Sequence, residues 1–404
     1  MKHALTIVFC LVALCSQAAT NTAATAAYSD VNTALGLCAN GDTLAIPAGN
    51  VSWGSQLNVG SKLIWIIGSG TNSTIITNGF GSSLITWAPN TKSSIIRISQ
   101  MEFRSAYGKF YTVDLKGPAN MRIDHCRFVG GEDVLSWNFN TPGTGQCIGV
   151  VDHCEFINCR TAYRVFDERT TDGGTPGSVA WTEPIVTGTT NVPVFEDDLF
   201  HFNSSFSQSS DAAQFYGQYG GKVCVRHCKF GTSTSDAFQQ DWIDAHGDDP
   251  GYSVILYEVY QNSFFEGTQG SLGANGECNA RGGSHIYWSN TFTTISLPAW
   301  QIIKYNPTDV HVVTNSFYYG NTWNGDTTQA DQVENDSPSD LHLNVQYFFR
   351  AIQSGDVWNP YTPLIYPHPL VTSQDGGGGS PLPSSLTFGG GSIATGSGSS
   401  ISFR

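Results

Sequence analysis

The clearest regularity in this sequence is a short alternation of apolar and polar positions that ends in phenylalanine. The motif reads apolar, any, apolar, two variable residues, Cys or Asn, any, Phe, as in MRIDHCRF and VCVRHCKF. Alternation of this kind is typical of a β-strand with one buried face. The copies end at the following residues: Phe103, Phe128, Phe156, Phe206, Phe230, Phe264, Phe292 and Phe317.

The spacing of these copies predicts a solenoid. They recur about every 25 residues, and we interpret the interval of 50 residues between Phe156 and Phe206 as two coils, one without a visible motif. Coils this short bury their apolar side chains only by stacking on their neighbours. The sequence therefore predicts a β-solenoid built from short strands.

Two columns of equivalent positions support this prediction. Five residues before each phenylalanine the side chains are nearly all apolar, which predicts an inward column: Ile98, Ile123, Val151, His201, Val225, Val259, Tyr287 and Val312. Two residues before it stand Met101, Cys126, Cys154, Ser204, Cys228, Asn262, Asn290 and Asn315. Stacked at the ~4.8 Å strand spacing, these asparagines are predicted to form a hydrogen-bonded ladder. The cysteines are predicted to be buried packing thiols rather than metal or redox groups.

Several segments resemble the exported pectin-lyase-like right-handed parallel β-helix proteins. The opening GDTLAIPAGNVSW (41–53), the early coils SKLIWIIGSG and STIITNG, and the closing YTPLIYPHPL (361–370) carry the resemblance. It implies an all-β fold, a single-stranded right-handed parallel β-helix, which we expect to have about ten coils.

The two ends of the chain differ from the repeats. Residues 1–18 are predicted to be a secretory signal, with the basic Met1-Lys2-His3, an apolar stretch at 4–14 and small residues for cleavage. We therefore expect the protein to be secreted, to the extracellular space or the periplasm. The β-helix is assigned to 19–370, and 371–404 is a Gly/Ser-rich linker and tail. The tail is either disordered, which we favour, or the start of an immunoglobulin-like module.

Composition narrows the functional classes. The 404 residues carry a formal net charge of −14, which argues against a nucleic acid partner. No stretch after the signal approaches the ~20 apolar residues of a membrane span. Low charge combined with many aromatic residues excludes a wholly disordered chain. Eight cysteines remain after the signal, and their connectivity cannot be deduced from spacing.

The polar, outward columns predict one glycan-binding surface. Alternation along the strands places Phe200, Phe202, Tyr260 and Trp288 outside, beside Arg226 and Glu258. Aromatic faces pack against sugar rings, so this strip suits a polysaccharide. The alternative is that loops of long coils cover the rings.

Residues 236–283 hold the richest chemistry. His246 follows Phe230 by 16 residues and Arg281 follows Phe264 by 17, so we expect them to be neighbours on adjacent coils, with Lys304 approaching from the next. The segments DAHG and RGG, and the arginine at 226, also resemble recurring segments of the family subgroup. The alternative is structural: His246 caps a turn, and Arg281 pairs with Asp244.

The resemblance implies a lyase that cleaves an acidic, uronate-containing polysaccharide by β-elimination. Such a reaction needs a base and a cation that stabilises the enolate-like intermediate. The base candidates are Arg281 and His246, with Lys304 beside them. Calcium is the candidate ion, with Asp244, Asp248 and Asp249 as its ligands.

Two other functions stay open. An inverting glycoside hydrolase needs two carboxyl groups, for which Asp248 and Asp249 with Asp244, or Glu258, are candidates. A non-catalytic carbohydrate-binding solenoid, an adhesin or a fibre, suits the export, the polar surface and the flexible tail. A binding solenoid requires no cluster of titratable groups, whereas an enzyme does.

Overall fold

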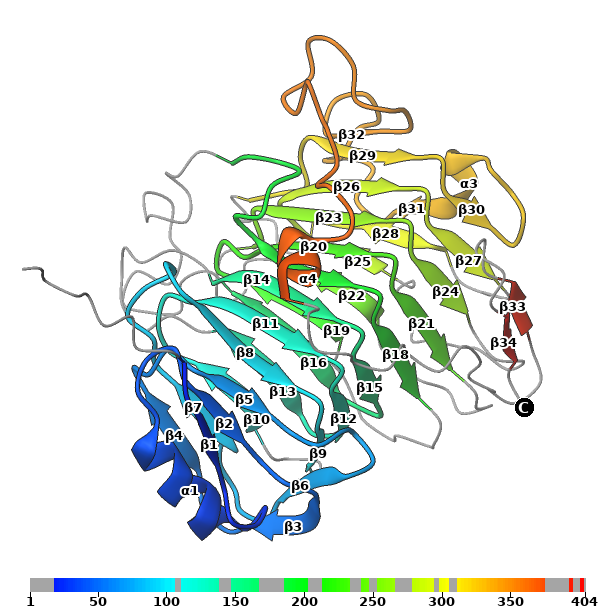
Figure 1. The fold of residues 1–404 in the computed structure, drawn as a ribbon. Helices are drawn as coiled ribbons and strands as arrows, with labels where there is room; N and C mark the ends of the chain where they lie inside the picture. The colour runs from blue at the N-terminus through cyan, green and yellow to red at the C-terminus, as the bar shows by residue number, and fades with distance from the viewer. Residues whose placement is uncertain are drawn as a thin grey trace, which may run out of the picture.

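The protein forms three long parallel sheets, which we name sheets A, B and C (Figure 1). The computed structural model describes residues 18–105, 110–137, 147–166, 185–202, 213–232, 241–246, 253–265, 278–293, 298–304, 311–374, 392–394 and 400–402. Within these residues no helix is long and apolar enough to cross a membrane.

Sheet A has 12 strands and sheets B and C have 10 each. Sheet A contains β1 (Thr20–Thr22), β2 (Thr43–Ala45), β5 (Trp65–Ile67), β8 (Ile95–Ser99), β11 (Asn120–Asp124), β14 (Ile148–Asp152), β17 (Pro193–Glu196), β20 (Lys222–Arg226), β23 (Leu256–Tyr260), β26 (Ser284–Trp288), β29 (Ser316–Tyr319) and β32 (Tyr347–Phe348). Sheet B contains β3 (Gly49–Trp53), β6 (Thr74–Asn78), β9 (Glu102–Ser105), β12 (Arg127–Gly130), β15 (Glu155–Ile157), β18 (Leu199–Phe202), β21 (Lys229–Thr232), β24 (Ser263–Phe265), β27 (Thr291–Thr293) and β30 (Thr322–Trp323). Sheet C contains β4 (Leu57–Gly60), β7 (Ile85–Trp87), β10 (Phe110–Leu115), β13 (Asp133–Trp137), β16 (Thr161–Phe166), β19 (Ala213–Gln218), β22 (Asp241–Ala245), β25 (Cys278–Ala280), β28 (Trp300–Ile302) and β31 (Val333–Asn335).

Neighbouring strands in the main run of each sheet are three elements apart in the chain, so every coil gives one strand to each sheet. This is a right-handed parallel β-helix, and the predicted fold class and coil number are confirmed. At its N-terminal end, α1 (Tyr28–Leu37) packs against the first coils through Val31, Ala34 and Leu35.

Apolar columns fill the interior of the β-helix. Six of the motif phenylalanines, joined by Phe200, stack in a row in which neighbouring ring centroids lie 4.5–5.4 Å apart. A second row follows the register of sheet A: Ile66, Ile98, Ile123, Val151, Phe195, Val225, Val259, Tyr287 and Tyr318. Both rows are buried, because alternation along each strand turns these side chains inward.

Two of the eight predicted motif copies are out of register. The partner of Phe156 is Phe200, not Phe206, and the partner of Phe292 is Trp323, not Phe317. Because β15 pairs directly with β18, the long interval holds no extra coil. At the first of these strands a Phe with suitably spaced apolar residues occurs twice, and at the second the true partner is a Trp, which the motif does not include. Phe206 lies outside the described residues.

The same shift corrects the columns. The inward positions predicted for His201 and Val312 belong to Phe195 and Tyr318. His201 lies instead on β18 of sheet B. Ser204 lies outside the described residues.

The asparagine ladder is confirmed with one substitution. Asn262 Nδ2 donates to Asn290 Oδ1 at 3.0 Å, and Asn290 Nδ2 donates to Asn321 Oδ1 at 3.0 Å. Asn321 therefore takes the position predicted for Asn315. Earlier in the same row, Cys126, Cys154 and Cys228 are buried, as all eight described cysteines are, and none of the eight forms a disulfide. Burial raises the thiol pKa of Cys154 and Cys228, which fits their prediction as packing groups.

Tight turns join sheet A to sheet B. Seven consecutive turns, from β8–β9 to β26–β27, each hold a non-glycine residue with positive φ: Gln100, His125, His153, Asp197, His227, Gln261 and Ser289. The longer connections flank sheet C instead, such as 203–212 before β19 and 266–277 before β25. Because binding residues concentrate on or beside long connections, sheet C is the face on which a site is expected.

A C-terminal segment crosses the outer face of sheet A. We call residues 358–374 the strap; it ends in α4 (Pro369–Gln374), which packs on β14 (Figure 1). Trp358 Nε1 donates to the carbonyl of Asn315 at 2.9 Å, and Arg122 Nη1 donates to the carbonyl of Leu370 at 3.3 Å. The strap thus spans sheet A from β29 to β11.

The predicted signal and tail fall mostly outside the described residues. Residues 1–17 are not described, so the signal and secretion stay predictions. In the tail, β33 (Ser392–Ala394) and β34 (Ser400–Ser402) pair antiparallel. The remaining short helix, α3 (Gln329–Gln332), precedes β31.

Candidate functional site

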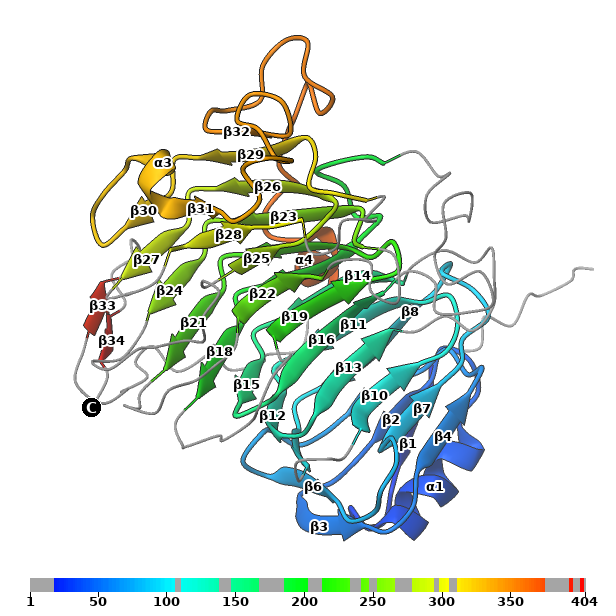
Figure 2. The same ribbon diagram turned by 180° about the vertical axis from the view of Figure 1, so that it is seen from behind.

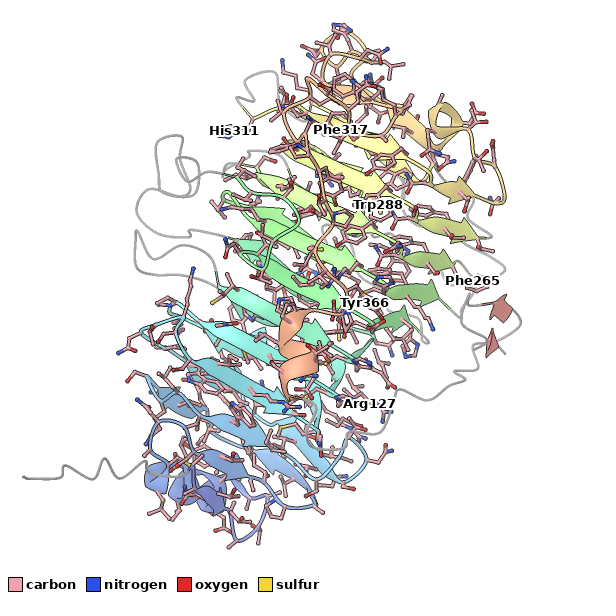
Figure 3. All side chains as sticks on the ribbon, turned by 45° about the horizontal axis from the view of Figure 1, so that its top comes forward. Arg127, Phe265, Trp288, His311, Phe317 and Tyr366 are labelled. Carbon is pink, nitrogen blue, oxygen red and sulfur yellow. The ribbon has the colours of Figure 1, made fainter. Side chains whose placement is uncertain are left out.

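The predicted aromatic strip on sheet A is covered by the strap. Tyr260 is buried, and its ring stacks on the half-buried Trp288 at 4.7 Å. Trp288 Nε1 donates to the Tyr361 hydroxyl at 3.3 Å. Figure 3 shows Trp288 beside the strap, to which Tyr366 belongs. These rings are therefore covered, but by the strap rather than by the loops of long coils that the alternative named.

The polar members of the strip also bind the strap. Arg226 forms an ion pair with Glu196 at 2.6 Å and donates to the carbonyls of Leu364 and Ile365. Glu258 accepts hydrogen bonds from the Tyr361 hydroxyl at 2.9 Å and the Gly188 amide at 3.0 Å. These contacts do not support the glycan-binding role predicted for Arg226 and Glu258.

Glu258 shows how closed this face is. Burial raises its pKa to about 6, against the lowering effect of its hydrogen bonds to Gly188 and Tyr361. Phe200 does not belong to the strip at all, since it stacks inside the helix between Phe156 and Phe230. The side chain of Phe202 lies outside the described residues.

Sheet C brings together the other predicted residues. Asp244 lies on β22 and His246 directly follows that strand, while Arg281 directly follows β25. Ala245 pairs with Ala280, so His246 and Arg281 are neighbours on adjacent coils, as predicted. Figure 2 shows β22 and β25 side by side.

The three side chains contact one another. Arg281 Nη1 lies 3.2 Å from His246 Nδ1, and Arg281 Nε lies 3.3 Å from Asp244 Oδ1. His246 Nδ1 lies 3.3 Å from Asp244 Oδ2. The exposed fractions of Asp244, His246 and Arg281 are 2%, 8% and 9%, so the charges interact with little screening by water.

The charge state of Asp244 follows from these contacts. Burial by itself raises the pKa of Asp244, but the positive charge of Arg281 and the hydrogen bond from His246 outweigh it and lower that pKa below its usual value. Asp244 is therefore a carboxylate at neutral pH. The structural alternative, an Asp244–Arg281 ion pair between coils, is present, and His246 joins it.

The histidine can act as a base or as an acid. A neutral imidazole with its proton on Nδ1 donates to Asp244 and keeps the lone pair on Nε2. In the other tautomer, Nδ1 accepts a hydrogen bond from Arg281 and Nε2 carries the proton. Both forms suit proton transfer to or from a substrate.

Two further residues, which the sequence did not reveal, join this cluster. Tyr216 on β19 pairs in register with Asp244, and its ring lies 5.0 Å from the ring of His246. The Arg164 guanidinium on β16 lies 4.5 Å from the Tyr216 ring centroid. Counting residues from the phenylalanines of sheet B does not predict that these residues lie near His246, because the connections to the sheet C strands differ in length from coil to coil. The feature of the sequence that could have indicated them is the alternation of side chains in the segments AYRVF and AQFYGQ.

Lys304 belongs to a different contact. Ala280 pairs with Ile302, which places Lys304 one residue beyond the level of Arg281. Lys304 Nζ forms an ion pair with Asp340 Oδ1 at 3.0 Å. The structure thus gives Lys304 a partner outside the cluster.

The described carboxylates do not fit a calcium site. Asp244 and Asp241 both face Arg281, at 3.3 Å and 3.9 Å, so a guanidinium already neutralises them. Among the described residues no three metal-binding side chains converge. Asp248 and Asp249 lie outside those residues, so calcium stays a prediction from the sequence.

Comparisons with known proteins give a fold likeness only. No protein-family model and no curated protein matches the chain. The chain is similar to an alginate lyase from Paenibacillus sp. str. FPU-7, with 12% identity, a TM-score of 0.35 and coverage of 76% of this chain and 87% of that one. It is also similar to the catalytic domain of a GH87 alpha-1,3-glucanase in complex with nigerose, with 10% identity, a TM-score of 0.31 and coverage of 83% and 68%. At these values neither likeness carries an argument about activity.

Proposed function

We propose that this protein cleaves a polysaccharide at the outer face of sheet C, by β-elimination at a uronate residue. The observation that carries the proposal is the contact of Asp244, His246 and Arg281, which two adjacent coils bring together. A base, a carboxylate that orients it and a cation are the parts that such an elimination requires.

The residues take the following roles. In the tautomer with the proton on Nδ1, Asp244 accepts a hydrogen bond from Nδ1–H of His246, which leaves the Nε2 lone pair for the substrate. Nε2 removes the proton on the carbon next to the uronate carboxyl group. The electron pair of that C–H bond forms the new double bond. The bond to the glycosidic oxygen breaks, and this oxygen leaves with its electron pair and takes up a proton.

Arg281 stabilises the charge that develops during this step. As the proton leaves, negative charge moves onto the carboxyl oxygens of the uronate. A guanidinium presents fixed hydrogen-bond donors that match a carboxylate. Its electrostatic stabilisation of that carboxylate is stronger where water is excluded. Arg281 is about nine-tenths buried, which meets that condition.

A glycoside hydrolase is the second candidate, and one observation favours it. Asp241 and Asp244 face the same guanidinium, so two carboxyl groups lie near each other on β22. Paired carboxyl groups are what an inverting or retaining hydrolase needs. The net charge of −14 also favours a glycan without negative charge.

A cleavage screen tests the proposal. The purified protein is incubated with polyuronates, glycosaminoglycans and neutral glucans, with calcium or with a chelator, and both ultraviolet absorbance and reducing ends are followed. The proposal predicts rising absorbance on a uronate polymer, and a loss of about 10²-fold or more in His246→Gln.

Three other results of this screen would each have a different meaning. Reducing ends without absorbance would establish the hydrolase and direct attention to Asp241 and Asp244. Retention of a glycan without any cleavage would identify a binding solenoid and overturn the proposal. Loss of activity only in the chelator would show that calcium takes part.

A further inference from the structure

We propose that Tyr216 and Arg164 are positioning residues that hold the His246 imidazole in place. This inference rests on the proposed function, since it concerns the base of the same site. It assigns roles to two residues that lie one and two coils before His246 along sheet C.

The first link is the stack of Tyr216 on His246. The ring centroids lie 5.0 Å apart, and the planes are tilted by 32°. Tyr216 pairs in register with Asp244, so its ring lies at the level of the carboxylate that orients His246. An imidazole held by a carboxylate through Nδ1 can still rotate about that contact. A ring packed beside it removes this freedom.

The second link is Arg164, on the strand before Tyr216. Its guanidinium lies 4.5 Å from the Tyr216 ring centroid and 5.7 Å from that of Phe166. Asp133 fixes the other side of Arg164 through an ion pair of 2.8 Å. Cation–π contacts of this kind are strongest where the cation is desolvated.

The contacts thus form one continuous chain on the outer face of sheet C. It runs from Asp133 through Arg164 and Tyr216 to His246, across β13, β16, β19 and β22, and it meets Arg281 after β25. Supporting contacts of this type hold a catalytic group to within a fraction of an ångström.

The same contacts exclude a simpler role for Tyr216. Rings that stack on sugars need an open face, but Tyr216 is only 8% exposed and packs between Arg164 and His246. Its ring therefore supports the site rather than lining it. The hydroxyl is not needed for this role.

The test separates the ring from the hydroxyl. Tyr216→Phe keeps the ring, Tyr216→Leu removes it, and Arg164→Gln removes the cation. Tyr219→Leu is the matched control, since Tyr219 packs on Phe166 in the same cluster. Thermal unfolding verifies that each variant is folded before the comparison.

The first readout is kinetic. On the cleaved glycan, Tyr216→Leu and Arg164→Gln are expected to lower kcat about 10–100-fold, with KM nearly unchanged. Tyr216→Phe and Tyr219→Leu are expected to keep kcat within about threefold of the wild type. An equal loss in Tyr216→Phe would make the hydroxyl the acting group and overturn the positioning role.

The second readout does not depend on any activity. Diethyl pyrocarbonate modifies neutral imidazoles, and peptide mass spectrometry gives the rate at His246, with His342 as reference. Tyr216→Leu should accelerate modification of His246 several-fold, while Tyr216→Phe and Tyr219→Leu leave it unchanged. An unchanged rate in Tyr216→Leu would contradict the inference. An accelerated rate in a protein that cleaves no glycan would retain the positioning and reject the proposed function.

Discussion

Asp198 occupies a position in the row of buried side chains where later coils have the asparagines of the hydrogen-bonded ladder. Asp198 stands two residues before Phe200, in the row that holds Asn262 and Asn290. Its Oδ1 accepts the Cys154 amide at 2.7 Å, as Asn262 Oδ1 accepts the Cys228 amide at 2.9 Å. Its Oδ2 is buried without a hydrogen-bond partner. A protonated Asp198 reproduces an asparagine, since its hydroxyl can donate where the amide does.

Burial and electrostatics favour the protonated form. Burial raises the pKa of Asp198 well above its usual value, and the charges of Asp152, Asp197 and Glu196 add to the effect. The folded pKa lies above the unfolded value of about 3.9. The stability linked to this group is therefore complete below about pH 4 and is lost as pH rises toward the folded pKa.

Asp198→Asn is expected to remove this loss. The variant should exceed the wild type in free energy of unfolding by about 1–3 kcal/mol at about pH 9, because no buried oxygen is left without a donor. At about pH 4 the two proteins should differ little. Denaturant unfolding at both pH values measures the difference, and a variant less stable than wild type at about pH 9 would contradict the assignment.

At the scale of elements, regular strands were predictable and connections were not. The alternation in copies such as MRIDHCRF places strands correctly, because inward and outward positions have different chemistry on every coil. The copies at Phe206 and Phe317 failed where a coil is lengthened or the turn sequence changes. Phe317 pairs with Ile286 in sheet A, since FYYGNTW supplies the last turn through Asn321 and Trp323.

The strap is the element that sequence reasoning missed. Its residues 361–370 resemble the closing segment of a family, and this resemblance does not indicate which face they cover. The strap contains few strand-like alternations, and charged groups of sheet A bind its backbone carbonyls. Arg226 donates to Leu364 and Ile365, while Arg122 donates to Leu370 and Val371.

Arg226→Leu tests the strap contact. Arg226 and Glu196 are both fully buried and their side chains lie 2.6 Å apart. Because the change leaves the buried carboxylate of Glu196 without its cation, we expect it to lower the free energy of unfolding by about 3–5 kcal/mol. Arg104→Leu is the control, since the side chain of Arg104 is 47% exposed and its partner Glu102 also pairs with Arg127. That change should cost no more than about 1 kcal/mol. Denaturant unfolding measures both variants. Similar losses of unfolding free energy would contradict the stabilising role of the buried Arg226–Glu196 pair.

At the scale of the whole molecule, the sequence correctly predicted which residues are neighbours on one of the two candidate surfaces. Offsets from Phe230 and Phe264 brought His246 and Arg281 together because their connections have nearly equal length. The strip of Tyr260 and Trp288 failed because a segment distant in sequence covers it, and column arithmetic describes only one coil and its neighbours. The strap covers sheet A from β29 to β11, so we place the proposed reaction on the outer face of sheet C.

The catalytic cluster is tested by comparing Arg281→Gln with Lys304→Gln on a cleaved glycan. Both changes remove a cation near the C-terminal ends of sheet C strands, but Arg281 contacts His246 and Asp244 whereas Lys304 pairs with Asp340. We expect Arg281→Gln to lower kcat/KM by about 10²-fold or more and Lys304→Gln to leave it nearly unchanged. Equal losses in both variants, or full activity in Arg281→Gln, would contradict a catalytic cluster of Asp244, His246 and Arg281.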